Sequence, residues 1–455
     1  MNQPVNELSD KRLGELRRMV TSPILTKNDQ EYSQARRVWN GMIDRKPSAI
    51  VRPTSIAEVM QVVRAAREFH WSVTVRGGGH SVSGKSVADD AMMIDLSLMN
   101  AIQVNPGAQS VVVQGGAKWG AFDRECERHQ LATTGGVISS TGVGGLTLGG
   151  GIGWLMGKHG LSCDNLVSAD MVGADGSHLS VSESQNEDLF WAIRGGGGNF
   201  GIVTALEFRL HPLQSVQAGL LLYPFGSAFD LLRRYRDVTV AAPDELTAYA
   251  ALMTGHGNPM AAIAMCDSAL HRGSANVSSQ FSLPNPPVAD LTGEKKYTEL
   301  QTMLDISAPA GMHYYFKCPF LRELSDEVLR VIVEHTASMP TEQTQVVLEH
   351  MHGAASRVPV SATAFGLRRT HYSINIMPAW TDPAMAEKCI DWAREFASAM
   401  EAFGASDAYV NYLGEEGASA VRASYGANYD RLANLKKKYD PDNFFQFNQN
   451  IPPAG

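Results

Sequence analysis

The sequence predicts an α+β protein with more than one domain. Three observations lead to this prediction. The chain has 455 residues, which is more than one hydrophobic core usually holds. Glycine-rich loops follow strand-like runs in its first half, and the composition changes near residues 215 and 405. With 44% hydrophobic and 19% charged residues, the chain has the makeup of a globular protein with a sizeable core.

Charge and cysteine content exclude several classes of partner. The formal charge of −8 argues against nucleic acid and anionic membrane surfaces. No apolar run approaches the roughly 20 residues that span a bilayer. The N-terminus has no apolar signal segment, so a cytoplasmic location is expected. The five cysteines are widely spaced without a C-x-x-C pair, which favours reduced thiols and no metal site.

The N-terminal region predicts a helical cover followed by a β-α-β unit. Apolar residues recur at helical spacing among charges over residues 1–46, which indicates one or two polar helices. A strand at 48–52 follows. Ser55 and Glu58 have the spacing of a capping box and mark the start of a helix. A second strand at 72–75 completes the unit.

This second strand leads into VRGGGHSVSG at 75–84. Three glycines there expose backbone amides next to a single imidazole, His80, at the end of a strand. Such a loop suits a cofactor that carries phosphate.

A denser glycine region lies at 133–154, after a predicted strand at 111–114 and a helix at 119–129. Helix or regular strand is not expected in it, because glycine loses so much backbone entropy on ordering. A chain accepts that cost where its backbone must approach a ligand closely. The alternative is a set of tight turns and bulges in a β domain.

Residues 166–183 predict a hairpin with Asp175 and Gly176 in its turn, and a helix follows at 186–193. The glycines of the next stretch, 194–201, match G-x-G-x-x-G. However, 202–210 is β-like where a dinucleotide fingerprint needs a helix. A glycine-rich connection into a strand is therefore the favoured interpretation.

The remaining chain predicts a second α+β domain that roofs a site, and then a docked tail. Its expected strands lie at 218–223, 246–253, 261–265, 313–317, 345–351 and 370–377, and its helices at 229–238, 326–338 and 383–403. A strand at 408–413 and a helix at 419–438 come next, with the basic triplet 436–438 as a solvated helix end. The aromatic-rich stretch 439–453 is expected to be docked, since disordered tails lack aromatics.

Five separated motifs occur in the order found in one family, and together the chain resembles the berberine bridge enzyme-like flavoprotein oxidases. This family belongs to the larger group with the vanillyl-alcohol oxidase or PCMH-type FAD-binding domain. The motifs are VRGGGHSVSG at 75–84, TGVGGLTLGGGIGWLMGKHGLSCDN at 141–165, LFWAIRGGGGNFGIVT at 189–204, AYVNY at 408–412 and YDPDNFFQFNQNIPP at 439–453.

The resemblance implies a division of the chain into four parts. A helical cover at 1–46 precedes an FAD-binding domain of two α+β subdomains at 47–214. A substrate domain with a large antiparallel sheet covered by helices occupies 215–404. The segment 405–455 then returns to the FAD domain.

The resemblance also implies FAD bound through one covalent 8α-histidyl link from His80. A neutral imidazole is a competent nucleophile near neutral pH, which supports this role; the alternative is a histidine that only forms hydrogen bonds. Many relatives carry a second link from a cysteine whose position here is Ile138, so no cysteinyl link is expected. Cys163 is expected to be a buried structural cysteine. The residues expected to bind FAD are Arg76, Gly77, Gly78, Gly79, His80, Ser81, Gly84, Thr141, Gly142, Gly144, Gly145, Gly149, Gly150, Gly153, Val203, Asn411, Tyr412 and Asn448.

Tyr412 is the first candidate for the catalytic base, by resemblance. A tyrosine needs a cationic or hydrogen-bonding neighbour to act at neutral pH, and the alternative is a ring that only shapes the pocket. Strand alternation would place Tyr409 and Asn411 on the opposite face. His352 is the second candidate, as the base itself or as a group that lowers the pKa of Tyr412, with a purely structural role equally open. His350 shares its strand face.

Four further residues bear on the reaction. Ser373 lies where some relatives carry an acid, which puts a carboxylate base in doubt. Arg368 and Arg369 are candidates for binding an acidic substrate group, or for surface ion pairs. Thr141 lies at the position that controls oxygen access, and its valine-like shape favours an oxidase over a dehydrogenase.

The resulting prediction is an FAD-dependent oxidase that takes a hydride from an alcohol, either sugar-like or a hydroxylated natural product, and passes electrons to O2 to give hydrogen peroxide. The expected partners are a small-molecule substrate and O2, without nucleic acid or membrane. The alternatives are an amine or alkaloid oxidase, a flavin dehydrogenase of the same fold, and a flavin-binding protein without turnover. The substrate and the oligomeric state stay open.

Overall fold

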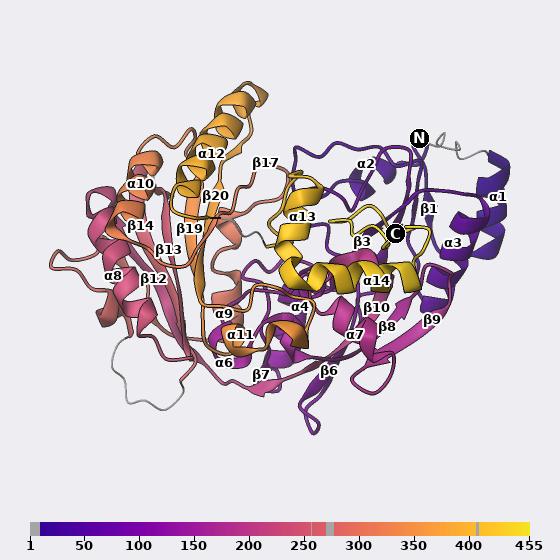
Figure 1. Ribbon diagram of the computed structural model, residues 1–455, viewed down its shortest axis with the longest axis horizontal. Coiled ribbons are helices and arrows are strands. Elements are labelled where there is room, and N and C mark those ends of the chain that lie inside the picture. Colours follow the sequence, from indigo (N-terminus) through magenta and orange to yellow (C-terminus); the bar gives the residue numbers. More distant parts are fainter. Residues whose placement is uncertain (1–9, 256, 270–276, 406–408) are drawn as a thin grey trace.

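The computed structural model describes residues 10–255, 257–269, 277–405 and 409–455. Its helices and strands form the α+β architecture that the sequence predicts, with two small sheets at one end and one large sheet at the other (Figure 1). No helix among the described residues has both the length and the hydropathy of a membrane span.

The first small sheet contains the predicted β-α-β unit. Its strand order is β1-β2-β4-β3, with β1 Ile24–Leu25, β2 Ala49–Val51, β3 Val73–Arg76 and β4 Met92–Asp95. Both β2 and β3 run parallel to β4. Helix α3 (Ile56–Glu68) connects them, and the Ser55 hydroxyl caps it by accepting from the backbone N–H of Glu58. The helix α1 (Asp10–Met19) packs on α3, and the short α2 (Tyr32–Ala35) follows in the N-terminal segment.

The second small sheet is antiparallel, in the order β5-β6-β10-β8-β9. Its strands are β5 Ile102–Asn105, β6 Ser110–Gln114, β8 Leu166–Val172, β9 His178–Ser182 and β10 Ile202–Arg209. The predicted hairpin is confirmed as β8 and β9, with Gly176 at φ +75° in the turn. The glycine-rich stretch before β10 leads into a strand, so the interpretation against a dinucleotide fingerprint is confirmed. Helices α4 (Trp119–Glu127) and α7 (Glu187–Ile193) occupy predicted positions, and β7 Leu131–Ala132 pairs with β11 His211–Pro212.

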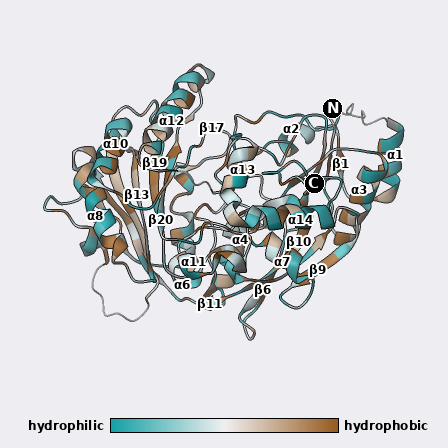
Figure 2. Ribbon diagram, in the orientation of Figure 1, coloured by the Kyte–Doolittle hydropathy of each residue, from teal (hydrophilic) through white to brown (hydrophobic). Residues whose placement is uncertain are grey.

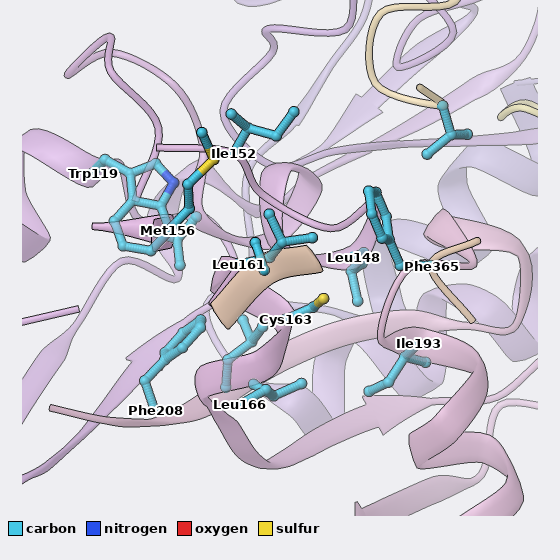
Figure 3. Close-up of a cluster of buried hydrophobic side chains, with 14 of the residues drawn as sticks. Trp119, Leu148, Ile152, Met156, Leu161, Cys163, Leu166, Ile193, Phe208 and Phe365 are labelled. Atoms are coloured by element: carbon cyan, nitrogen blue, oxygen red, sulfur yellow. The ribbon is translucent and has the colours of Figure 1, made fainter. Parts of the chain in front are cut away.

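The prediction that the region 133–154 contains no helix is wrong. Helix α5 (Val143–Leu148) lies in it, and α6 (Met156–His159) follows. The glycines serve the close approach of two loops instead, because a Cβ on Gly142 would overlap the backbone of Gly78. Beneath this region lies a buried apolar core in which side chains such as Trp119, Leu161 and Phe208 gather (Figure 3). Cys163 belongs to this core, as predicted.

The large sheet has the strand order β15-β12-β14-β13-β19-β20-β18, with β16 also paired to β12. Its strands are β12 Val216–Pro224, β13 Leu246–Gly255, β14 Asn258–Asp267, β15 Ala289–Asp290, β16 Gly293–Lys295, β18 Phe320–Leu321, β19 Gln345–Met351 and β20 His371–Met377. All of these pairs are antiparallel.

Helices α8 (Ala228–Val240), α10 (Asp326–Thr336) and α12 (Ala386–Glu401) cover one face of this sheet (Figure 1). Figure 2 shows hydrophilic residues on these helices and mostly hydrophobic ones on the strands. The antiparallel sheet with helices on one face agrees with the prediction for 215–404. The predicted strand at 313–317 is shorter, since β17 (His313–Tyr314) ends early and pairs with β21 (Ala379–Trp380). Two short helices, α9 (Tyr297–Thr302) and α11 (Gly353–Arg357), lie in connections.

The C-terminal helix predicted at 419–438 is two helices, α13 (Ala418–Tyr425) and α14 (Tyr429–Tyr439). Gly426 lies between them at φ +50°, which a continuing α-helix does not allow. Both helices lie along the end of the molecule that holds the small sheets (Figure 1).

The prediction of a solvated basic triplet is wrong for its first residue. Lys436 is fully buried, and its ammonium group donates to Asp440 Oδ2 at 2.7 Å and to the carbonyl oxygens of Asn199 and Phe445. Its long side chain thus clamps the tail onto the segment before β10, while Lys437 is exposed.

Candidate active site

A cavity of about 500 Å³ lies where three parts of the chain meet. The glycine loops 77–86 and 136–145 line one side, strands β13, β19 and β20 line another, and the C-terminal tail contributes residues such as Phe447 and Asn448. Its size falls within the usual range of small-molecule sites, about 300–1,000 Å³.

The glycine side of the cavity has the properties of a phosphate cradle. The backbone N–H groups of 77–82 make no hydrogen bond to another described residue. Adding a Cβ to Gly78 would drive it into the backbone of Gly142, so the two loops form one continuous wall. The only carboxylate among the cavity-lining residues is Glu349, on the opposite wall, while Lys85 lies on the glycine side. Unpaired amides and a cation suit an anionic pyrophosphate.

His80 lies on this wall in a defined orientation. Its ring is stacked on Trp39 with centroids 4.8 Å apart, and its Nε2 lies 2.7 Å from Ser140 Oγ. Burial, with help from the positive charge of Lys118, lowers the pKa of His80 to about 4. The imidazole is therefore neutral at pH 7, and Nδ1 has no partner among the described residues. A neutral ring with one nitrogen held and one free can act as a nucleophile.

The structure places most, but not all, of the predicted cofactor residues at the cavity. Those that line it are Gly77, Gly78, Gly79, His80, Ser81, Thr141, Gly142, Gly144, Gly145, Val203, Asn411, Tyr412 and Asn448. Asn448 donates to the carbonyl oxygens of Gly198 and Phe445, which fixes its amide in the wall.

Five predicted cofactor residues do not line the cavity. Arg76 contacts the Ala35 carbonyl and lies beside Asp95, so it anchors the glycine loop from behind. The others are glycines, Gly84, Gly149, Gly150 and Gly153, at which a Cβ would overlap Ile43, Asn411, Phe365 and the Gly135 carbonyl, respectively. These glycines allow the wall to pack.

Tyr412 and Glu349 meet on the wall opposite the glycine loops. The Tyr412 hydroxyl donates to the Glu349 carboxylate, at 3.1 Å from Oε1 and 3.2 Å from Oε2. Ser373 Oγ donates to Oε2 at 2.8 Å. Burial raises the pKa of Glu349 despite these hydrogen bonds. Burial and the neighbouring carboxylate raise the pKa of Tyr412 well above its usual value.

The segment that carries Tyr412 is a turn, and the predicted strand at 408–413 is wrong for its described part, 409–413. The backbone N–H groups of Tyr412 and Leu413 both donate to the Tyr409 carbonyl. Asn411 and Tyr412 therefore both line the cavity, rather than facing opposite sides. Asn411 donates to the Leu146 carbonyl at 3.0 Å and to the Tyr409 hydroxyl at 2.8 Å, which ties this turn to the glycine region.

His352, the second predicted catalytic residue, is not among the cavity-lining residues. It is stacked on His350 at 5.3 Å, as its predicted shared face requires, and its ring contacts the position where a Cβ of Gly157 would lie. The side chains of β19 that line the cavity are those of Gln345, Val347 and Glu349. His350 and His352 alternate with them along the chain and therefore point away from the cavity. His352 therefore reaches neither Tyr412 nor the cavity.

Glu349 is a cavity-lining residue that sequence reasoning missed. Ser373 had put a carboxylate base in doubt. The structure has a carboxylate on the neighbouring strand, β19, where Glu349 accepts a hydrogen bond from the Ser373 hydroxyl. Strand alternation on β19 could have identified Glu349, as an acid whose neighbours two positions away, Val347 and Met351, are apolar. Arg368 is buried and paired with Asp164 at 2.6 Å, and neither Arg368 nor Arg369 lines the cavity, so neither can bind a substrate there.

Comparisons with known proteins agree with this geometry. Residues 47–182 match the family model described as FAD binding domain, and residues 408–452 match the one described as berberine and berberine like. An FAD-linked oxidoreductase of Dictyostelium discoideum is 31% identical over 94% of this chain and 94% of its own. The (R)-6-hydroxynicotine oxidase of Paenarthrobacter nicotinovorans is 26% identical over 96% of this chain and 98% of its own.

The solved structure of BBE-like 1 from Physcomitrella patens has the same fold, with a TM-score of 0.89 at 23% identity over 98% of this chain and 99% of that one. The matched domain makes FAD the cofactor of this protein. The chain is an enzyme and belongs to the berberine bridge enzyme-like FAD-linked oxidoreductases.

Proposed function

We propose that this protein is an FAD-dependent oxidase that removes a hydride from an alcohol. The observation that carries the proposal is the hydrogen-bonded pair of Tyr412 and Glu349 on the wall opposite the glycine cradle. Alcohol oxidation needs a group that takes the hydroxyl proton while the hydride leaves the carbon. Bound FAD supplies the hydride acceptor, and its reduced form passes two electrons to O2 to give hydrogen peroxide.

The pair takes the proton as a relay. The raised pKa of Tyr412 keeps its hydroxyl protonated, so it can only accept a proton as it releases its own. That proton goes to Glu349, which must be ionised beforehand. Ser373 holds the carboxylate in place through the bond to Oε2. Glu349 is thus the final acceptor, and Tyr412 is the group that touches the substrate.

On the cofactor side, we propose that His80 forms the single covalent link through Nδ1. Three features support it: the neutral ring, the engagement of Nε2 with Ser140, and the stacking on Trp39. Ile138 lines the cavity where relatives carry a linking cysteine. FAD-binding residues are proposed to be the cavity-lining set above, with Thr141 beside the path of O2.

Two alternatives remain as outcomes of experiment. An amine C–N oxidase is the first, because one relative is an (R)-6-hydroxynicotine oxidase. A dehydrogenase, whose reduced flavin reacts slowly with O2, is the second. The proton relay favours the alcohol, since an O–H proton must leave in the same step as the hydride.

The test is anaerobic stopped-flow reduction of the flavin by a panel of alcohols, sugars and amines, followed by mixing with O2 and measurement of hydrogen peroxide. For the substrate that bleaches the flavin, Tyr412→Phe should slow reduction by about 10²-fold or more. Bleaching by amines alone would contradict the alcohol assignment. Slow reoxidation without peroxide would show a dehydrogenase.

A further inference from the structure

The large sheet forms the wall of the cavity opposite the glycine loops, here called the substrate wall, and most of its side chains are aliphatic or aromatic. Strands β13, β19 and β20 of the large sheet supply it at every second residue, and β12 and β14 contribute one residue each. Its aliphatic members are Leu220, Ala251, Met253, Ala264, Val347 and Met377. Aromatic rings from Trp39, Tyr314 and Phe316 close the adjoining side. No lysine, arginine or histidine of the described chain lies on this wall.

Most polar side chains of this wall already form hydrogen bonds within the protein. The Gln345 amide donates to the Ser307 carbonyl at 3.0 Å, and the Tyr314 hydroxyl donates to the Pro309 carbonyl at 2.7 Å. The Asn375 amide donates to the Val347 carbonyl and to Ser373, and its oxygen accepts from the Cys318 thiol at 3.3 Å. The Tyr249 hydroxyl is the exception: it is buried and has no hydrogen-bond partner among the described residues, while its ring packs on Trp154 at 4.5 Å. The Tyr412–Glu349 pair and the Tyr249 hydroxyl are therefore the polar groups of this wall that are left to meet a substrate, and the rest of its surface is aliphatic or aromatic.

The mouth of the cavity continues the apolar wall. The segment around Asp305–Ser307 is fixed at three points: Ser139 donates to Asp305, Gln345 to the Ser307 carbonyl, and the Trp39 indole to the Ala308 carbonyl. Within it, Ile306 lines the cavity and is 91% exposed. An apolar side chain held at the entrance favours an apolar substrate over a sugar.

From these observations we infer the substrate class: an uncharged alcohol with one or two rings, apolar except for its reacting hydroxyl, such as an aromatic or alicyclic natural product. This inference rests on the proposed function, since it takes the Tyr412–Glu349 pair as the proton acceptor. A free sugar would bury several hydroxyl groups without partners, and each costs roughly tenfold or more in binding. A carboxylate substrate would face Glu349 with no cation to pair it.

The test compares two substrate classes on the holoenzyme. Anaerobic flavin reduction is measured with cinnamyl alcohol and cyclohexylmethanol, and with glucose, xylose and cellobiose. We expect the second-order rate constant for the apolar alcohols to exceed that for the sugars by about 10²-fold or more. Faster reduction by a sugar overturns the inference and leaves the proposed oxidase standing. Reduction by amines alone overturns both.

A pair of variants distinguishes the loss of an apolar contact with the substrate from a general effect of a valine-to-glutamine exchange on the protein. Val347→Gln introduces an amide beside Glu349, and it should lower the rate constant for the apolar alcohols by about tenfold or more. Val240→Gln makes the same exchange at a side chain that is 72% exposed at the end of α8, and it should leave the rate unchanged. An unchanged rate in Val347→Gln would contradict an apolar contact at this position.

Binding supplies a readout that does not need turnover. Cinnamaldehyde and cyclohexanecarbaldehyde, the oxidised counterparts of the alcohols, should shift the flavin absorbance of the oxidised enzyme on titration, and gluconolactone should not. Tighter binding of the lactone, or no binding of either aldehyde, overturns the inference even when no alcohol bleaches the flavin.

Discussion

At the scale of single residues, two carboxyl oxygens and one phenol define the proposed chemistry. Glu349 is buried in an apolar wall, and its raised pKa means that it loses its proton only at a higher pH than an ordinary glutamate. In the proposed relay, Tyr412 releases its own proton to Glu349 as it takes the proton of the substrate. His352, the histidine predicted from the strand pattern, lies one residue past the end of β19 and does not line the cavity.

Glu349→Gln removes the final proton acceptor while it keeps the volume and the hydrogen bond from Tyr412. We expect flavin reduction to slow by about 10²-fold or more. In the native enzyme, the rate should rise with pH as Glu349 ionises and level off above its raised pKa. The variant should lose this rise, as measured by anaerobic reduction across pH 5 to 9. Glu342→Gln, at an exposed position, is the control. A variant that keeps the native pH profile would assign the base elsewhere.

His80 offers a second prediction at this scale. His80→Ala should retain FAD without covalent attachment, because the glycine cradle is unchanged. Acid precipitation of the native protein should leave the flavin with the pellet, and precipitation of the variant should release it. Replacement of His352 by alanine should leave the attachment intact, since it lies outside the cavity. Acid-stable flavin in His80→Ala would show that the link lies on another residue.

At the scale of elements, buried ion pairs and glycines decide how segments meet. The described part of the C-terminal tail, 409–455, carries no strand that could join a sheet, so its position depends on side chains. Lys436 and Asp440, one helical turn apart, are both fully buried. The ammonium group of Lys436 also satisfies two carbonyl groups, one on the tail and one before β10.

Lys436→Met tests this clamp. The change leaves Asp440 as an unpaired buried carboxylate, which should destabilise the protein by about 3–5 kcal/mol. Thermal unfolding is the measurement, and Lys437→Met, at the exposed neighbour, is the control. Equal stability of the two variants would mean that the clamp contributes nothing.

At the scale of the whole molecule, the large sheet and the small sheets enclose the cavity, and buried histidines make the assembly sensitive to acid. His350 is 3% exposed, neither ring nitrogen has a partner, and burial lowers its pKa to about 3. The unfolded chain binds a proton near pH 6.5, and the folded chain does not. Stability from this site is therefore present above pH 6.5 and is lost as the pH falls towards 3.

His350→Phe removes this titration while it keeps an aromatic ring against Tyr372, on which His350 is stacked at 4.5 Å. Relative to the native protein, the variant should gain about 1.4 kcal/mol of unfolding free energy for each pH unit below 6. Above pH 7 the difference should not change with pH. Denaturant unfolding at pH 7.5, 6 and 5 measures it, with the exposed His129→Phe as control. A difference that stays constant down to pH 5 would contradict a neutral buried imidazole.

Much of this molecule could be predicted from local pattern. The β-α-β unit, the β8–β9 hairpin and the strands and helices of the large sheet follow periodicity, caps and turn residues, which act over a few positions. Helix α5 was missed because the prediction considered only the backbone entropy that glycine loses on ordering. Glycine is needed at the start of this helix because Gly142 packs directly on the backbone of Gly78. The turn at 409–413 was missed because its apolar residues are buried by contacts from distant segments, which no local strand pattern reveals.

The sequence by itself determined the family motifs, the glycine cradle and the single histidine that faces it, because these depend on residue type and on neighbours along the chain. Only the tertiary structure decided which side chains meet across the cavity. Glu349 and Tyr412 are 63 residues apart and come together through the packing of β19 against the C-terminal turn. Their shifted pKa values, like the burial of Lys436, arise from exclusion of water by segments distant in sequence.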